Sequence, residues 1–417
     1  MLIKSFTKAV VLGLAAVCST SIVYGQNFNG GGSTLDGREL KNIEDGLRPV
    51  QTAVPFLTIA PDSRSAALGD QGVATTPDEY SSYWNPGKLS QIKNDYGFAI
   101  TYNPWLRRIV NDMALMYLTG YYKLRKEDAI SFSLTYFDLG KIDFTDINGN
   151  IIMPYNPREF SPMVTYSRLL GKGFSGGLSL KYIFSDLTGS VNSGTTTANQ
   201  SRPGQAAAAD IGFYYNRDLV IADRDFNIAA GAAITNIGNK ISYSNASRAD
   251  FIPTTLRLGT VLTHQVDDFN KFSFGIQASK LMVPSSEILY ASTDSLNRPR
   301  NPYLATPNKG LVSGMFGSFT DAPFGAREEF QEVMLSGGVE YWYDDMFAVR
   351  GGYFYEDIHK GNRKYFTVGL GIRYQTFGLD FCYLIATQRA NPLSETFRFA
   401  LSFNFDRKTK EADSVVE

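Results

Sequence analysis

The sequence is poor in the side chains that carry most protein chemistry. It holds only two histidines, His264 and His359, and two cysteines, Cys18 and Cys382. We find no Cys or His set with metal-site spacing, no nucleophile elbow and no glycine-rich phosphate-binding turn. Carboxylates precede His359, but an isolated histidine of this kind is more often solvated than catalytic. The sequence therefore predicts a protein that is not an enzyme and needs no metal or cofactor.

The chain also lacks a surplus of charge and a long apolar segment. Its 40 Lys and Arg residues almost balance its 41 Asp and Glu residues, which gives no support to a nucleic-acid partner. After residue 25 there is no run of about 20 apolar residues, the length that a membrane helix needs. Strands of a transmembrane barrel escape such a search, because only every second side chain faces lipid.

Residues Met1–Gly25 have the features of a secretory signal peptide. Two lysines precede a mostly apolar segment, Ala9–Val23, and small residues follow near Gly25. A membrane anchor is the competing interpretation, but Cys18 and the hydroxyl residues after it interrupt the apolar segment. Lipidation at Cys18 is disfavoured by the bulk of the valine before it. Removal of the segment would leave Cys382 as the single thiol, so no internal disulfide could form.

From Tyr96 onward apolar and polar side chains alternate, which is the period of a β-strand. Aromatic residues make up 13% of the chain, and its glycines number 38; both suit the aromatic girdles and close packing of a membrane barrel. We therefore predict an all-β fold, a transmembrane antiparallel β-barrel of about fourteen strands with an N-terminal plug. The strands are expected at 96–104, 111–122, 128–139, 160–170, 174–186, 205–216, 226–237, 253–265, 271–282, 331–343, 346–357, 364–374, 377–387 and 396–405.

The connections between these strands alternate in length, as they do in bacterial outer-membrane barrels. Short links are expected at Lys172, Asp344-Asp345, Gln375-Thr376 and 266–269, and long loops at 141–159, 187–204, 238–252 and 283–330. The short links belong on the periplasmic side, and an even strand number then places both termini in the periplasm. The expected parts are a signal peptide (1–25), a periplasmic lead and plug (26–95), the barrel (96–405) and a charged periplasmic tail (406–417).

Nine charged side chains fall on the polar, inward-facing positions of these strands. Two interpretations are open: a polar pathway through the lumen, or charges that pair with one another and with the plug. We favour pairing, because both signs occur in similar number and no ring of one sign is evident. The nine are Lys181, Asp210, Arg257, Glu332, Glu340, Arg350, Arg373, Asp380 and Arg398.

The segment Ala60–Ser90 precedes the first strand and is short of aliphatic residues. Because it cannot bury enough apolar surface to order itself, we expect it to lie inside the barrel as a plug. A turn at Asn85-Pro86-Gly87, with Tyr83 and Trp84 packing beside it, would hold it in place. An ordinary surface loop is the alternative that these residues leave open.

The loop at 283–330 carries an apolar cluster that is unusual for a segment outside the membrane: Leu311, Val312, Met315, Phe316, Phe319 and Phe324. Exposed apolar patches often mark binding surfaces. The cluster is therefore a candidate contact with a protein partner. Alternatively, the loop folds down and caps its own barrel.

The segment Thr52–Ser90, TAVPFLTIAPDSRSAALGDQGVATTPDEYSSYWNPGKLS, resembles the amino-terminal region of the PorV family, outer-membrane barrels of the type IX secretion system. That family is part of the wider FadL-like barrels of long-chain fatty-acid transporters, whose plug carries an Asn-Pro-Ala element. Asn85 and Pro86 match this element, and Gly87 replaces its alanine.

The resemblance implies a non-enzymatic role in the bacterial outer membrane. Its implied partners are the large SprA/Sov-like barrel translocon, the carboxy-terminal signal domains of cargo proteins, an attachment complex with a PorU-like sortase, and outer-membrane lipid or lipopolysaccharide. It also associates the chain with cargo shuttling and gliding motility. The alternative, from the wider group, is a FadL-like transporter for small hydrophobic molecules.

Overall fold

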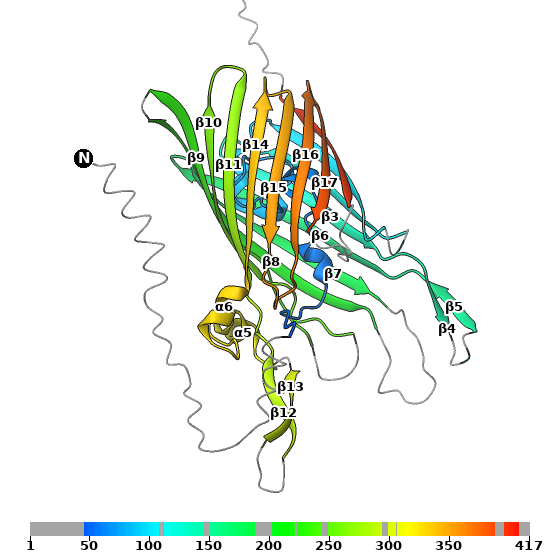
Figure 1. The fold of residues 1–417 in the computed structure, drawn as a ribbon. Helices are drawn as coiled ribbons and strands as arrows, with labels where there is room; N and C mark the ends of the chain where they lie inside the picture. The colour runs from blue at the N-terminus through cyan, green and yellow to red at the C-terminus, as the bar shows by residue number, and fades with distance from the viewer. Residues whose placement is uncertain are drawn as a thin grey trace, which may run out of the picture.

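A closed antiparallel barrel forms the body of the molecule (Figure 1). The computed structural model describes residues 46–107, 110, 112–145, 148, 150–187, 202–221, 223–243, 249–293, 299–305, 307–387 and 396–407. Within these residues fourteen strands close the barrel. They are β1 (Tyr96–Pro104), β2 (Ala114–Lys123), β3 (Asp128–Asp138), β6 (Arg158–Gly171), β7 (Phe174–Asp186), β8 (Gly204–Ile221), β9 (Arg224–Gly238), β10 (Thr255–Gln265), β11 (Asn270–Leu281), β14 (Val333–Tyr343), β15 (Phe347–Tyr355), β16 (Lys364–Tyr374), β17 (Phe377–Ala386) and β18 (Phe397–Phe405).

Every expected strand is present, and closure follows from pairing of the first strand with the last. Tyr96 of β1 lies opposite Phe405 of β18, and Tyr102 lies opposite Phe399. The largest differences are at β8, which runs five residues past its expected end at 216, and at β2, which begins three residues after its expected start at 111. Alternation of the side chains therefore predicted the strands well, while their ends depended on the pairing of neighbouring strands.

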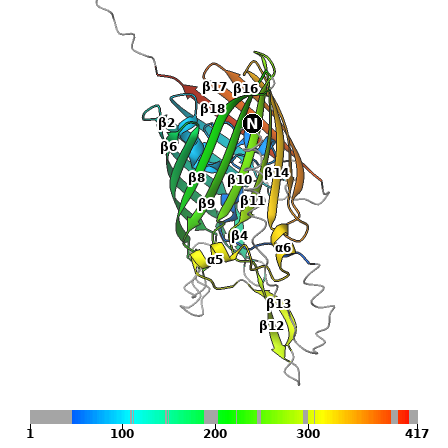
Figure 2. The same ribbon diagram turned by 90° about the vertical axis from the view of Figure 1, so that its left-hand side faces the viewer.

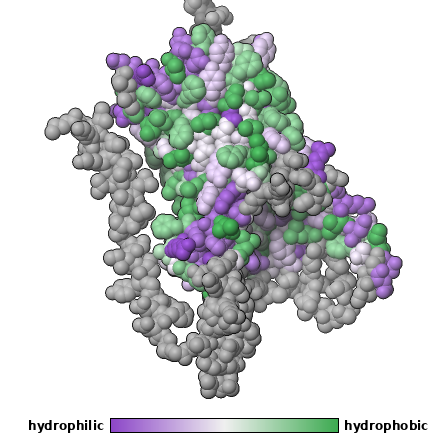
Figure 3. Space-filling view, viewed as in Figure 1, coloured by the Kyte–Doolittle hydropathy of each residue, from purple (hydrophilic) through white to green (hydrophobic). Residues whose placement is uncertain are grey.

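The outer wall of the barrel is apolar. Along β18 the exposed Phe397 and Phe399 alternate with the buried Arg398 and Ala400, and the other strands repeat this pattern. In the space-filling view the middle of the barrel is largely green and pale between purple ends (Figure 3). Such an outer wall suits contact with the hydrocarbon of a bilayer. Among the described residues, no helix has the length and apolar character required for a membrane span.

The two ends of the barrel differ in their connections. The short-turn end, uppermost in Figure 1, carries the expected tight links at Lys172, 266–269, Asp344-Asp345 and Gln375-Thr376. The long-loop end carries two small hairpins, β4 (Ile142–Thr145) with β5 (Ile151–Tyr155) and β12 (Glu287–Thr293) with β13 (Pro299–Ala305). Two short helices, α5 (Leu311–Gly317) and α6 (Ala326–Gln331), lie at the same end (Figure 2).

The plug crosses the lumen from wall to wall. It contains four short helical turns: η1 (Pro55–Thr58), α3 (Ser63–Ala67), α4 (Ser81–Trp84) and η2 (Pro86–Gln91). The α3 turn contacts β15, β16, β17 and β18, whereas η2 contacts β3, β6, β7 and β8. Since these two groups of strands lie on opposite sides of the ring, the plug spans the barrel.

The first described residues lie at the long-loop end, whereas the sequence led us to expect the lead at the end of the short links. The Arg48 N–H donates to the carbonyl of His359 at 2.6 Å, and the Ala53 N–H donates to the carbonyl of Phe251 at 2.9 Å. Both acceptors belong to connections at the long-loop end. The chain therefore passes through the lumen once, from this end to the start of β1 at the short-turn end. The expected signal peptide, most of the lead and tail residues 408–417 lie outside the described residues.

A plugged lumen and an outer apolar surface

Asn85 organises the turn at the centre of the plug. Its Oδ1 accepts a hydrogen bond from the Gly87 N–H at 2.9 Å. Its amide nitrogen donates to the carbonyls of Val73 and Phe213, each at 2.9 Å. Because Phe213 belongs to β8, one side chain ties two parts of the plug together and to the barrel wall. The buried amide has its main polar atoms satisfied, as burial requires.

The two aromatic residues before Asn85 extend this attachment. The Trp84 Nε1–H donates to Asp62 Oδ1 at 2.7 Å, and the Tyr83 hydroxyl contacts the carbonyls of Leu57 and Ile59 at 3.0 and 2.9 Å. Asp62 also caps α3 by accepting from the Ser65 N–H. The predicted turn residues are therefore close together in the structure and join η1, α3 and η2.

Glycines in the barrel wall allow the plug backbone to approach. A Cβ added at Gly212 would lie 2.2 Å from Asn85 Oδ1, and one at Gly177 would lie 2.3 Å from the Pro86 carbonyl oxygen. On the opposite wall, a Cβ at Gly352 would lie 2.1 Å from the Gly69 nitrogen. These separations are far below van der Waals contact. Abundant glycine was visible in the sequence, but the particular glycines that face the plug could be known only from the fold.

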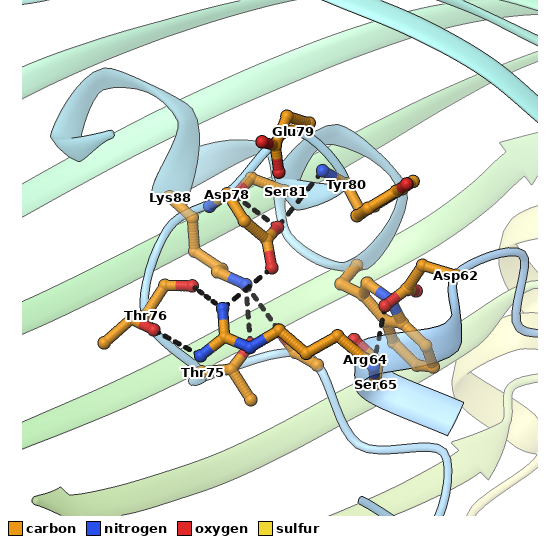
Figure 4. Close-up of polar contacts among 12 residues, drawn as sticks. Asp62, Arg64, Ser65, Thr75, Thr76, Asp78, Glu79, Tyr80, Ser81 and Lys88 are labelled. Atoms are coloured by element: carbon orange, nitrogen blue, oxygen red, sulfur yellow. Dashed lines mark hydrogen bonds and ion pairs between the residues drawn. The ribbon is translucent and has the colours of Figure 1, made fainter. Parts of the chain in front are cut away.

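Arg64 links the plug electrostatically to the wall. Figure 4 shows its contacts inside the plug, with Thr76 and Asp78. Its guanidinium forms two hydrogen bonds with Glu340 of β14, at 2.8 and 3.0 Å, and one with Asp78 of the plug at 3.0 Å. Glu340 also accepts from Arg350 at 2.6 Å. Arg350 continues to Asp380 at 2.7 Å. Arg64 was not among the predicted site residues, because its partners are distant in the sequence.

The inward-facing charges predicted from the alternation form pairs. Lys181 pairs with Asp210 at 2.8 Å, and Arg398 pairs with Asp70 of the plug at 3.2 Å. Arg257 differs: no carboxylate of the described residues lies within 4.0 Å, and its guanidinium lies over the rings of Tyr83 and Trp84. The ion pairs support the pairing hypothesis over an open polar pathway.

A cavity of about 270 Å³ remains between the plug and the long-loop end. Pro49, Val50 and Thr52 line one side, and Met334 and Phe354 line another. Its charged lining residues are Asp70, Arg257, Glu332, Glu356, Lys360 and Arg363. The cavity is therefore mixed in character rather than a continuous apolar channel. Within the described residues, no cluster of three or more metal-ligating side chains is found.

The apolar cluster of the long loop divides between buried and exposed positions. Met315 is buried, and Leu311 and Phe324 are half-buried. Val312, Phe316 and Phe319 are 65%, 66% and 40% exposed. Phe330 of α6 is 71% exposed and was not predicted, because it lies outside the glycine-spaced cluster. The loop thus covers part of its own barrel and also presents an apolar surface; contact of that surface with a protein partner stays a prediction.

Ion pairs hold α6 over the end of the barrel. Glu328 accepts from Arg48 at 3.0 Å and from Lys360 at 2.6 Å. Lys360 also contacts Glu332 at 2.9 Å, and Lys280 contacts Glu329 at 3.0 Å. Burial alone would raise the pKa of Glu328, but the hydrogen bond and charge of Lys360, with help from Arg48, lower it below its ordinary value. The amino-terminal segment, the wall and α6 are therefore joined by one network.

A closed barrel with an apolar outer wall, a polar interior and a plug defines a bacterial outer-membrane barrel protein. The family model for type IX secretion system protein PorV matches residues 42–288, which is more than half of the chain. The chain therefore belongs to the PorV family and is an outer-membrane component of that secretion system.

Solved structures that are similar to this chain include two toluene transporters and a FadL homologue. The toluene transporter TodX of Pseudomonas putida has a TM-score of 0.49 and 11% identity, over 84% of this chain and 99% of that one. The toluene transporter TbuX of Ralstonia pickettii has a TM-score of 0.44 and 12% identity, over 84% of this chain and 100% of that one. A FadL homologue of Pseudomonas aeruginosa has a TM-score of 0.42 and 10% identity, over 86% of this chain and 100% of that one. At these values the likeness carries no functional argument. No curated protein matches the chain.

Proposed function

We propose that this protein is a non-enzymatic carrier that binds the carboxy-terminal signal domain of cargo at the SprA/Sov-like translocon. It would then deliver the cargo to the attachment complex that contains the PorU-like sortase. Membership of the PorV family supports this proposal. So does the plugged lumen, because a barrel crossed by Arg64, Asn85 and their partners offers no passage to a polypeptide. Cargo must then be held on the outside of the barrel.

The observation that carries the proposal is the exposed apolar surface of the long loop. Val312, Phe316, Phe319 and Phe330 are at least 40% exposed at the end of the barrel that carries the long loops. Burial of large aromatic side chains dominates the energetics of many protein interfaces. We propose that this end faces the cell exterior, that the carboxy-terminal tail is periplasmic, and that the surface contacts the translocon or the cargo domain.

A pull-down from mild detergent tests the proposal. The variant Val312→Ser/Phe316→Ser/Phe319→Ser should fold normally, because these side chains are exposed, but should recover at least about tenfold less translocon and cargo. The matched control is Ile151→Ser/Met153→Ser in the β4–β5 hairpin, where both side chains are also exposed at the long-loop end. Full recovery of both partners by the first variant would disprove the proposed contact.

The FadL-like alternative predicts a different outcome. A transporter of small hydrophobic molecules needs an apolar route. The cavity between the plug and the long-loop end has six charged residues in its lining, so it does not provide one. Hydrophobic ligand retained by the purified protein, together with an absence of protein partners, would favour the transporter.

A further inference from the structure

The short-turn rim carries an uneven distribution of charge. Over β2, β3, β6 and β7 it is mainly basic, and we call this part the basic arc: Lys123, Arg125, Lys126, Arg168 and Lys172. Glu127 and Asp128 are the carboxylates of these strands and turns, and Asp95 and Asp406 lie near Lys123 at the edge of the arc. Arg125, Lys126 and Lys172 are exposed, and no ion pair is found for any of these three within the described residues. The basic arc therefore has an excess of positive charge, and this charge is exposed at the short-turn end.

The nearly opposite side of the rim is acidic. The turns between β10 and β11 and between β14 and β15 carry Asp267, Asp268, Asp344 and Asp345. Lys271 is the nearby cation, and it pairs with Asp345. The basic arc is thus a local feature of one group of strands and not a general property of the rim.

Arg168 connects the basic arc to the lipid-facing wall. It follows Val164 and Tyr166 on the outward side of β6, where these side chains are exposed. Its side chain is half-exposed and lies 3.6 Å from Asp128, whose carboxylate also accepts the Tyr166 hydroxyl at 2.9 Å. Phe174, also exposed, is on the adjacent strand β7, and the exposed Tyr122 is on β2, on the far side of β3. A cation on a lipid-facing row is costly unless it reaches the polar interface, where aromatic side chains also concentrate.

We propose that the basic arc binds the phosphate groups of anionic phospholipids in the leaflet at the short-turn end. Lys and Arg near a membrane surface attract anionic lipids, and guanidinium groups bind phosphate with two parallel hydrogen bonds. The outward direction of Arg168 favours a lipid over an acidic protein that approaches along the barrel axis. The assignment to the periplasmic leaflet rests on the orientation proposed above, whereas the lipid preference itself does not.

Spin-labelled lipids test this proposal on the full-length protein in phosphatidylcholine bilayers. The fraction of motionally restricted label should be larger for phosphatidylglycerol than for phosphatidylcholine, with a ratio of association constants of about three or more at low salt. Roughly 1 M salt, where the Debye length is about 3 Å, should reduce this ratio toward one.

A matched pair of double variants locates the site. Lys126→Gln/Lys172→Gln removes two charges from the basic arc and should bring the ratio near one. Arg217→Gln/Arg224→Gln removes two exposed cations from the β8–β9 hairpin, beside three aspartates, and should leave the ratio unchanged. Heat-shifted gel mobility checks that both variants fold. The absence of any preference in the parent protein, or an equal loss in both variants, would overturn the proposal without affecting the proposed cargo function.

Discussion

At the scale of single residues, the plug is held by close approach more than by its own composition. Gly212 permits contact with the Asn85 side chain, and Asn85 then satisfies the carbonyls of Val73 and Phe213. The hydrogen bonds of Asn85 depend on the glycine, because a larger side chain at position 212 would displace the Asn85 amide from the two carbonyls. The Asn-Pro-Gly turn is therefore one half of a site whose other half is backbone on β8.

The variant Gly212→Ala should weaken the plug, because its methyl group would occupy the place of Asn85 Oδ1. Overpacking of this kind costs about 1–3 kcal/mol. The thermal unfolding midpoint should fall, and the plug should become more sensitive to protease. Gly337→Ala in β14 is the control, since the nearest atom to its added Cβ would be 4.0 Å away. Equal midpoints for the two variants would show that the contact does not stabilise the plug.

At the scale of elements, α6 is secured by charge rather than by an apolar core. Its Phe330 side chain is mostly exposed, whereas its Glu328 side chain is almost fully buried between Arg48 and Lys360. A six-residue helix has little stability of its own. The position of α6, and of the apolar surface beside it, therefore depends on these ion pairs.

Glu328→Gln should loosen α6, with a local cost of about 1.5–3 kcal/mol for lost hydrogen bonds to charged groups. Hydrogen exchange in α5 and α6 should become faster while the barrel strands are unchanged. Lys309→Gln is the control, because the pair of Lys309 with Asp321 is more exposed and such pairs contribute little.

The same group predicts a pH effect. Because the pKa of Glu328 is lowered in the folded protein, its stabilising contribution is present above the ordinary value of 4.5 and is lost as the pH falls through the folded pKa. Acid should therefore speed exchange in α6 of the parent protein but add little in the Gln variant. A parent protein that shows no acid response would contradict this role of Glu328.

At the scale of the whole molecule, the chain crosses its own barrel before forming it. Arg48 is fixed at the long-loop end, and β1 begins at the short-turn end beside Phe405. The two ends of the described chain therefore lie on opposite sides of the barrel. With the proposed orientation, Leu47 faces the exterior and Thr376 faces the periplasm.

Labelling with a membrane-impermeant maleimide on intact cells tests this arrangement. Leu47→Cys should react, because Leu47 is 62% exposed at the outer end, whereas Thr376→Cys should react only after the outer membrane is permeabilised. The parent protein provides the background, and its Cys382 is buried. Protection of Leu47→Cys together with labelling of Thr376→Cys would reverse the proposed orientation.

Patterns in the sequence were enough to predict the barrel, its strands and the unequal lengths of the connections, but they left open whether Ala60–Ser90 is a plug or a surface loop. These features are encoded locally, because alternation and turn residues are read over a few neighbouring positions. The partners of the plug could be known only from the folded chain, because Arg64 meets Glu340 and Asn85 meets Phe213 across long separations in the sequence. The position of the amino-terminal segment at the long-loop end could also be known only from the fold. No local pattern in the sequence sets the direction of this segment; the closure of the barrel and the contacts of Arg48 do.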